Sequence, residues 1–96
     1  MKDDILARVG DEAMWLQLAE EASELSQAAS KMVRYIHGTN PVYRDGVRVT
    51  DATELKADVI EEYMDVVNCC EHLSLPLQRG LIDEKNRRCR ERLGLE

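Results

Sequence analysis

The sequence predicts an all-α helical bundle, and three observations support this prediction. Apolar residues recur at alternating steps of four and three over the long stretch that ends before Gly38. A second stretch with helical periodicity follows Asp51, and a third, shorter one ends before Gly94. The chain has 96 residues, which is the length of one small domain, so we expect a single helical domain over residues 1–96.

The first half of the chain is expected to form two helices. A short helix is predicted over residues 3–9, with Gly10 available to end it. A long helix is predicted over residues 11–37, and Gly38 ends it. Its packing seam is predicted to comprise Leu18, Ala22, Leu25, Ala29, Met32 and Ile36.

Residues 38–50 interrupt the helical pattern. Asp45-Gly46 lies between the short runs Val42-Tyr43-Arg44 and Val47-Arg48-Val49, which is a signal for a β-hairpin. An irregular loop explains the same residues equally well, because an isolated hairpin is marginally stable without packing on the helices.

Two more helices complete the predicted bundle. A helix over about 52–73 is expected to begin with Asp51 and Glu54 as a capping pair. A last helix over about 76–93 follows, with Ser74 as its N-cap and a glycine directly after its end.

Charge and composition exclude several classes of function. The net charge is -6, from 19 acidic and 13 basic residues, so we do not expect the chain to bind nucleic acid. The chain has no Phe and one Trp, which leaves little aromatic surface for stacking on bases.

No segment is expected to engage a membrane or direct export. The N-terminus is acidic and has no apolar core of a signal peptide, and no apolar run approaches the ~20 residues that span a bilayer. The three cysteines are an odd number without a disulfide-like framework. We therefore expect a cytoplasmic protein.

Two acidic clusters are the most informative local feature. They are Glu20-Glu21-x-x-Glu24 on the long helix and Glu61-Glu62-x-x-Asp65 on the third helix. Residues three apart share a helix face, so each cluster directs a pair of carboxylates the same way. On the third helix the apolar arc is centred near Tyr63, Val66 and Cys70. In both helices the acidic pair lies at the rim of the apolar arc, where a half-buried site forms if the rims meet.

Divalent cations would relieve the repulsion among these carboxylates. Hard cations such as Mg²⁺ prefer oxygen ligands. The alternative is a pair of solvated acidic faces with no ligand. A di-iron carboxylate site would need Glu-x-x-His pairs, and the residues three before His37 and His72 are Arg34 and Cys69. Zinc would require His or Cys, and neither joins the clusters.

With these motifs, the chain resembles the MazG-like all-α nucleoside triphosphate pyrophosphohydrolases, whose signature is Glu-Glu-x-x-Glu on one helix and Glu-x-x-Asp on the next. The matching segments here are Glu20-Glu21-Ala22-Ser23-Glu24 and Glu62-Tyr63-Met64-Asp65. The flanking Gln17-Leu18-Ala19 and the turn Gly38-Thr39-Asn40-Pro41 also fit, so the resemblance covers about residues 14–93. The departure is the long gap between the motifs, widened by residues 42–50, which puts substrate specificity in doubt.

The resemblance implies cleavage of a (deoxy)nucleoside triphosphate between its α and β phosphates, giving the monophosphate and pyrophosphate. It implies Mg²⁺ as the cofactor, with Mn²⁺ as a substitute, and the metal would activate a water. The implied metal ligands are Glu21, Glu24, Glu62 and Asp65, and Glu20 is an outer partner or base. It also implies a four-helix core completed by a second subunit, in a homodimer or homotetramer.

Several further residues are candidates for binding the substrate. Lys85, Arg88 and Arg92 form one stripe on the last helix, where they could grip the triphosphate or only cover apolar surface. Asn68 lies three residues after Asp65 on the same rim. Trp15 could stack on a base, although a lone Trp on a helical stripe more often belongs to the core.

A second function from a different class stays open. The chain could be a non-catalytic acidic helical module that keeps the bundle fold and binds a partner without turnover. The complete set of four presumed ligands favours the enzyme.

Overall fold

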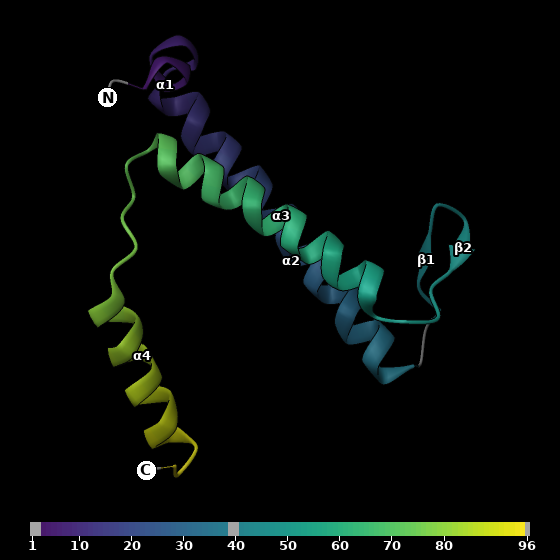
Figure 1. Ribbon diagram of the computed structural model, residues 1–96. Coiled ribbons are helices and arrows are strands. Elements are labelled where there is room, and N and C mark those ends of the chain that lie inside the picture. Colours follow the sequence, from purple (N-terminus) through teal and green to yellow (C-terminus); the bar gives the residue numbers. More distant parts are fainter. Residues whose placement is uncertain (1–2, 39–40, 96) are drawn as a thin grey trace.

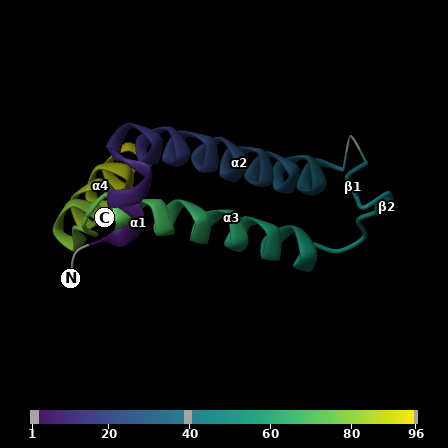
Figure 2. The same ribbon diagram turned by 90° about the horizontal axis from the view of Figure 1, so that it is seen from above.

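The computed structural model describes residues 3–38 and 41–95. These residues form four helices and one two-stranded hairpin, which confirms the predicted all-α fold. The elements are α1 (Asp4–Val9), α2 (Asp11–His37), β1 (Tyr43–Arg44), β2 (Val47–Arg48), α3 (Thr53–His72) and α4 (Arg79–Arg92). Helices α2 and α3 run antiparallel, side by side, with the hairpin at one end of the pair and α1 at the other (Figures 1 and 2).

The first two helices begin and end where the sequence indicates. Asp3 is the N-cap of α1, and its Oδ1 accepts a hydrogen bond from the Leu6 N–H at 2.8 Å. Gly10 separates the two helices with φ of 89°, a backbone conformation that favours glycine. Gly38 ends α2 in the left-handed conformation. Thr39 and Asn40 of the expected turn lie outside the described residues.

The β-hairpin forms at the expected dipeptide. Asp45 and Gly46 both have positive φ, as a two-residue type I′ turn requires, and Arg44 pairs with Val47 across the strands. The hairpin gains its stability from the helices. Val42 is buried, and the guanidinium of Arg44 donates two hydrogen bonds of 3.1 Å to the carboxylate of Asp58 on α3.

The packing seam between α2 and α3 differs from the prediction. On α2 the positions turned toward α3 are Met14, Leu18, Glu21, Leu25, Ala28, Met32 and Tyr35, all buried or half-buried. Ala22, Ala29 and Ile36 were expected in this seam, but they are exposed, and Ile36 is 73% exposed. On α3, Tyr63 is likewise exposed while Glu62 is half-buried.

The physical reason is that the apolar arc of each helix is wider than one contact. A helix can turn only part of such an arc toward a single neighbour. Both seams are rotated toward the acidic edge, so Glu21 and Glu62 lie within the contact and not at its rim. The unused apolar arcs of the two helices are left on the opposite side.

The boundary between α3 and α4 is also different. Ser74 was expected to cap the last helix, but it instead ends α3 with φ of 56°. The N–H groups of Ser74 and Leu75 bond back to Glu71 and Cys70, at 3.0 and 2.9 Å, in a Schellman motif. Residues 75–78 are then not helical, and α4 begins at Arg79 instead of residue 76. Proline at 76 favours an extended conformation at the residue before it.

The N-cap of α3 is Ala52, one residue after the predicted Asp51, and no side chain caps the helix there. Asp51 Oδ1 accepts a hydrogen bond from the Thr53 N–H at 2.7 Å. Glu54 does not return this bond to the cap, because its carboxylate lies 3.6 Å from the guanidinium of Arg44.

The chain is extended for its length. Its radius of gyration is 17.3 Å, against about 12.5 Å for a compact domain of this size. Helix α4 lies away from the α2–α3 pair and makes no extended packing contact with the other described elements (Figure 1). Within the described ranges, no helix has the length and apolar character needed to cross a bilayer.

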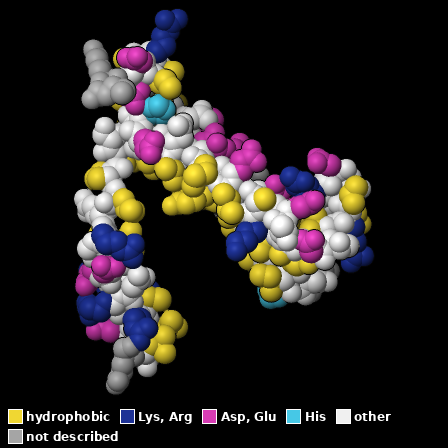
Figure 3. Space-filling view, viewed as in Figure 1, with side chains coloured by type: hydrophobic (Ala, Val, Ile, Leu, Met, Phe, Trp, Pro, Cys, Tyr) yellow, Lys and Arg dark blue, Asp and Glu magenta, His cyan; other side chains and the backbone are white. Residues whose placement is uncertain are grey.

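Hydrophobic side chains gather on one side of the α2–α3 pair and acidic side chains on the other (Figure 3). We call the hydrophobic side the apolar face. Its large side chains are between 48% and 73% exposed, and they are Trp15, Val33, Ile36, Ile60, Tyr63 and Met64. The opposite side, which carries both acidic clusters, is the acidic edge.

Candidate metal centre

The antiparallel pairing of α2 and α3 brings the two acidic motifs together at the middle of both helices. Carboxylate oxygens of Glu21, Glu24 and Glu62 all lie within 4.8 Å of one another. Glu21 and Glu62 are half-buried in the seam, whereas Glu24 is exposed at the acidic edge. Three of the four predicted ligands therefore form one oxygen cluster, which opens to solvent on the side of Glu24.

Two of the three clustered residues each have a buried carboxylate oxygen that is unpartnered among the described residues. Within the described residues, neither Glu21 Oε2 nor Glu62 Oε2 has a hydrogen-bond donor. A buried acceptor that lacks a donor is costly and calls for an explanation such as a bound ion. A divalent cation between these oxygens would satisfy both of them.

Gln17 orients Glu21 from one helical turn away. Its side-chain N–H donates to Glu21 Oε1 at 2.6 Å. This bond occupies one oxygen of the carboxylate and leaves the other, Oε2, for the centre of the cluster. Gln17 was expected only as flanking sequence of the first motif, although its spacing of four residues from Glu21 is the signal for such a contact.

The environment raises the pKa of Glu21. Burial is the largest cause, and the hydrogen bond from Gln17 partly opposes it. The neighbouring carboxylates of Glu24 and Asp65 raise the pKa further. The ionised cluster is therefore electrostatically unfavourable by itself, as expected of a site that binds a cation.

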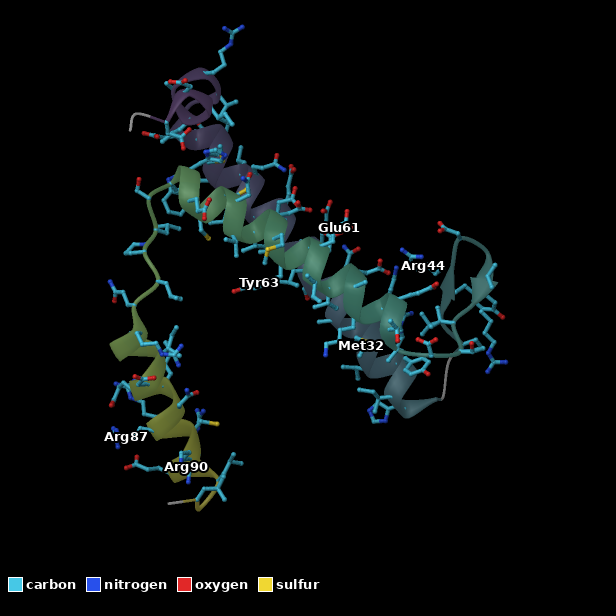
Figure 4. The ribbon with its side chains drawn as sticks, in the orientation of Figure 1. Met32, Arg44, Glu61, Tyr63, Arg87 and Arg90 are labelled. Atoms are coloured by element: carbon cyan, nitrogen blue, oxygen red, sulfur yellow. The ribbon has the colours of Figure 1, made fainter. Side chains whose placement is uncertain are left out.

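Asp65 lies beside the cluster and not within it. It is exposed, and its charge acts on Glu21 as described above. Glu20 and Glu61 are exposed as well, and Glu61 projects into solvent from the middle of α3 (Figure 4).

The donor set fits a hard cation. The cluster consists of carboxylate oxygens alone, which suit Mg²⁺ or Mn²⁺. Cys69 is buried on α3 close to the cluster, and burial raises the pKa of its thiol, as do the charges of Glu21, Cys70 and Asp65. Neither this thiol nor a histidine belongs to the oxygen cluster, and His and Cys are the ligands that zinc prefers.

The predicted substrate residues are only partly near this cluster. Asn68 lies on the turn of α3 that follows Asp65 and lines a cavity together with Gln17. Trp15 is nine residues before Glu24, which points it to the opposite side of α2, and it is 51% exposed on the apolar face.

The structure does not bring the basic stripe of α4 to the acidic cluster within one chain. Lys85, Arg88 and Arg92 are exposed on α4, which lies apart from the middle of α3 (Figures 1 and 4). Arg88 bonds to Glu84 of its own helix at 3.3 Å. These cations can therefore reach an acidic cluster only in another copy of the chain or after α4 has moved.

In comparisons with known proteins, no family model, curated protein or solved structure matched this chain.

Proposed function

We propose that this protein hydrolyses a (deoxy)nucleoside triphosphate to the monophosphate and pyrophosphate, with Mg²⁺ as its cofactor and Mn²⁺ as a substitute. The observation that carries the proposal is the cluster of Glu21, Glu24 and Glu62, where two buried oxygens have no donor within residues 3–38 and 41–95. A site of this kind at the open edge of two helices suits a cation that must also contact phosphate.

The ligands of the cation would be Glu21, Glu24 and Glu62, with Asp65 completing the set from the solvent side. A bound Mg²⁺ supplies charge neutralisation for the phosphates and lowers the pKa of a water molecule.

The other residues orient the cluster and handle protons. Gln17 holds Glu21 through Oε1 and leaves Oε2 available to a cation. Glu20 is exposed one step further round α2, where a carboxylate oxygen could accept a proton from the attacking water. The apolar residues beneath Glu21 and Glu62 exclude solvent from the inner side of the site and strengthen the electrostatic interactions there.

We further propose that the apolar face packs against a second copy in a homodimer or homotetramer. Large hydrophobic side chains that cover one side of a chain usually mark an interface. Helix α4 carries six basic and three acidic side chains, so its charge complements the acidic edge of a neighbouring copy. In this arrangement Lys85, Arg88 and Arg92 of one chain would meet the triphosphate bound by the other.

A cytoplasmic location belongs to the same proposal. Cys69, Cys70 and Cys89 are free thiols, which suits a reducing compartment.

The proposal is tested by measuring pyrophosphate release from a panel of ribo- and deoxyribonucleoside triphosphates, with and without Mg²⁺. The wild type should release pyrophosphate only with the metal. Glu24→Gln and Asp65→Asn should each lower kcat/KM by about a hundredfold or more. Glu61→Gln is the matched control, because it removes an exposed charge from the same acidic run and should change kcat/KM less than about twofold.

The same experiment separates the enzyme from the acidic binding module. A folded wild-type protein that binds Mg²⁺ and releases no pyrophosphate from any nucleotide would contradict the proposed activity.

A further inference from the structure

A cavity of about 390 Å³ continues the acidic edge toward α1. Its walls come from three helices and include Ile5 and Val9 of α1, Met14 and Gln17 of α2, and Asn68 and His72 of α3. Gln17 lies one turn before Glu21 on α2, and Asn68 lies one turn after Asp65 on α3. The cavity and the acidic cluster are therefore adjacent along the same two helices.

The cavity is within reach of a ligand held at the cluster. Gln17 contributes to both places, because it lines the cavity and donates to Glu21 Oε1. Seven residues, or roughly 10 Å of helix, separate Glu24 from Gln17. A nucleotide whose phosphates lie at the cluster can therefore extend its sugar and base in this direction.

The chemistry of the cavity suits a flat ring with a polar edge. Ile5 and Val9 of α1 and the buried Met14 of α2 supply apolar contacts. Asn68 and His72 of α3 supply polar groups. Apolar walls with a few convergent polar groups are typical of a small-molecule site.

Asp3 fixes the orientation of the His72 ring. The two carboxylate oxygens of Asp3 act as acceptors, one for the Leu6 N–H and the other, Oδ2, for His72 Nδ1 at 2.5 Å. An ionised carboxylate cannot donate, so Nδ1 carries a proton. In the neutral imidazole the opposite nitrogen, Nε2, is then a hydrogen-bond acceptor.

We propose that this cavity binds the nucleobase of the triphosphate. The side chains of Ile5 and Val9 cover the ring, while Asn68 and His72 Nε2 bond to its edge. With the imidazole neutral and Nε2 facing the exocyclic position of the ring, this acceptor pairs with the amino group of cytosine or adenine and meets an oxygen in uracil, thymine or hypoxanthine, so the two amino bases are preferred. The position of the phosphates rests on the proposed function, whereas the preference for a base does not require turnover.

The test compares the binding of ligands with and without a base. Isothermal titration in Mg²⁺ measures the affinity for α,β-methylene nucleoside triphosphates, which cannot be cleaved at this bond, and for inorganic tripolyphosphate. Val9→Trp fills the cavity from α1, and Asn68→Ala removes a polar group. Each should weaken binding of the cytidine analogue about tenfold and change the affinity for tripolyphosphate less than about twofold.

Two matched controls make the same substitutions away from the cavity. Val47→Trp adds the same bulk at an exposed hairpin position, and Asn86→Ala removes an exposed amide from α4. Neither should alter either affinity.

Three results would overturn the inference. One is that Val9→Trp and Asn68→Ala bind the nucleotide as tightly as the wild type does. Another is that each variant loses affinity for the nucleotide and for tripolyphosphate by the same factor. The third is equal wild-type affinity for the cytidine and uridine analogues. If the wild type shows base-dependent binding but releases no pyrophosphate, the proposed activity fails while the nucleobase cavity stands.

Discussion

In the metal-free protein, the position of Glu21 within the helix contact conflicts with the negative charge of its carboxylate. Its carboxylate lies in the helix contact with an oxygen that no donor of the described part of the chain reaches, and Glu24 and Asp65 add negative charge nearby. Each of these features favours the protonated form. A bound cation reverses this preference, so Glu21 links metal affinity to the stability of the α2–α3 pair.

Replacing Glu21 with Gln should therefore change stability in opposite directions with and without metal. In EDTA at neutral pH and fixed protein concentration, Glu21→Gln should raise Tm by a few degrees, because it removes a buried charge. With saturating Mg²⁺ the wild type should gain stability and the variant should not. Thermal denaturation in the two buffers measures both effects, and a lower Tm of the variant in EDTA would contradict this account.

The raised pKa of Glu21 also fixes the direction of the pH dependence. Because the pKa in the folded protein lies above its ordinary value of 4.5, the folded state binds this proton more tightly than the unfolded state. Without metal, protonated Glu21 contributes its full stabilisation of the folded state at a pH below the ordinary pKa. This contribution is lost as the pH rises through the raised pKa of the folded protein. Mg²⁺ competes with the proton, so its affinity should decline as pH falls through the same range.

Ser74 is a second residue whose conformation predicts a measurable effect. It ends α3 at φ of 56°, where glycine carries no steric penalty. Ser74→Gly should raise the free energy of unfolding by about 0.5–1 kcal/mol. Ser30→Gly is the matched control within α2, and there the same substitution should lower it by about 0.5–1 kcal/mol. Chemical denaturation measures both, and equal signs would refute the interpretation.

At the scale of elements, the hairpin depends on Arg44 for its attachment to α3. The guanidinium bridges the carboxylates of Asp58 and Glu54. Arg44→Met should accelerate hydrogen exchange at the Val49 N–H, which bonds to the Val42 carbonyl at 2.8 Å, and leave amides in the middle of α2 unchanged. Arg48→Met is the control. An unchanged exchange rate at Val49 in Arg44→Met would show that other contacts hold the hairpin.

The elements that the sequence predicts well are those set by local chemistry. Gly10, Gly38 and the Asp45-Gly46 turn all adopt positive φ or lie at element ends, as their residue types indicate. The rotation of the seam could not be predicted, because Ala22, Ala29 and Ile36 are as apolar as the residues that pack. Only the position of the partner helix decides between the two arcs.

In the candidate site, too, local spacing was predictable and the packing between helices was not. Helical spacing pairs Glu21 with Glu24 on α2, whereas Glu62 comes beside them only through the contact between α2 and α3. The burial of these carboxylates and the bond from Gln17 depend on how far each helix is rotated about its own axis. The spacing of residues in the sequence does not determine that rotation. The place of α4 was not predictable, because Lys85, Arg88 and Arg92 fit one helix face whether that face meets its own chain or another.

At the scale of the whole molecule, α4 lies apart from the acidic cluster of its own chain. Mixing two variants tests whether it acts on the cluster of a neighbouring copy. One chain carries Glu24→Gln and an intact α4, and the other carries an intact cluster with Lys85→Ala, Arg88→Ala and Arg92→Ala. Each variant alone should be inactive. If α4 acts on a neighbouring copy, co-refolding the two should restore up to about a quarter of wild-type pyrophosphate release, because only mixed dimers contain an intact pair.

If mass measurements confirm mixed oligomers and activity is still not restored, α4 acts on the acidic cluster of its own chain and not on that of a neighbouring copy. Light scattering of the wild type supplies the independent check, since a monomer at micromolar concentration would contradict an interface on the apolar face. Trp15→Glu or Tyr63→Glu, each at an exposed position of that face, should shift the wild-type oligomer toward monomer.

The central claim is that the acidic cluster supports metal-dependent cleavage between the α and β phosphates. Phosphorus NMR of the wild-type protein with a nucleoside triphosphate and Mg²⁺ tests this most directly, because it identifies both products at once. We expect signals of the nucleoside monophosphate and pyrophosphate, and none of them when EDTA replaces Mg²⁺. Formation of the diphosphate and inorganic phosphate, or an unchanged triphosphate across the whole panel of nucleotides, would contradict the account.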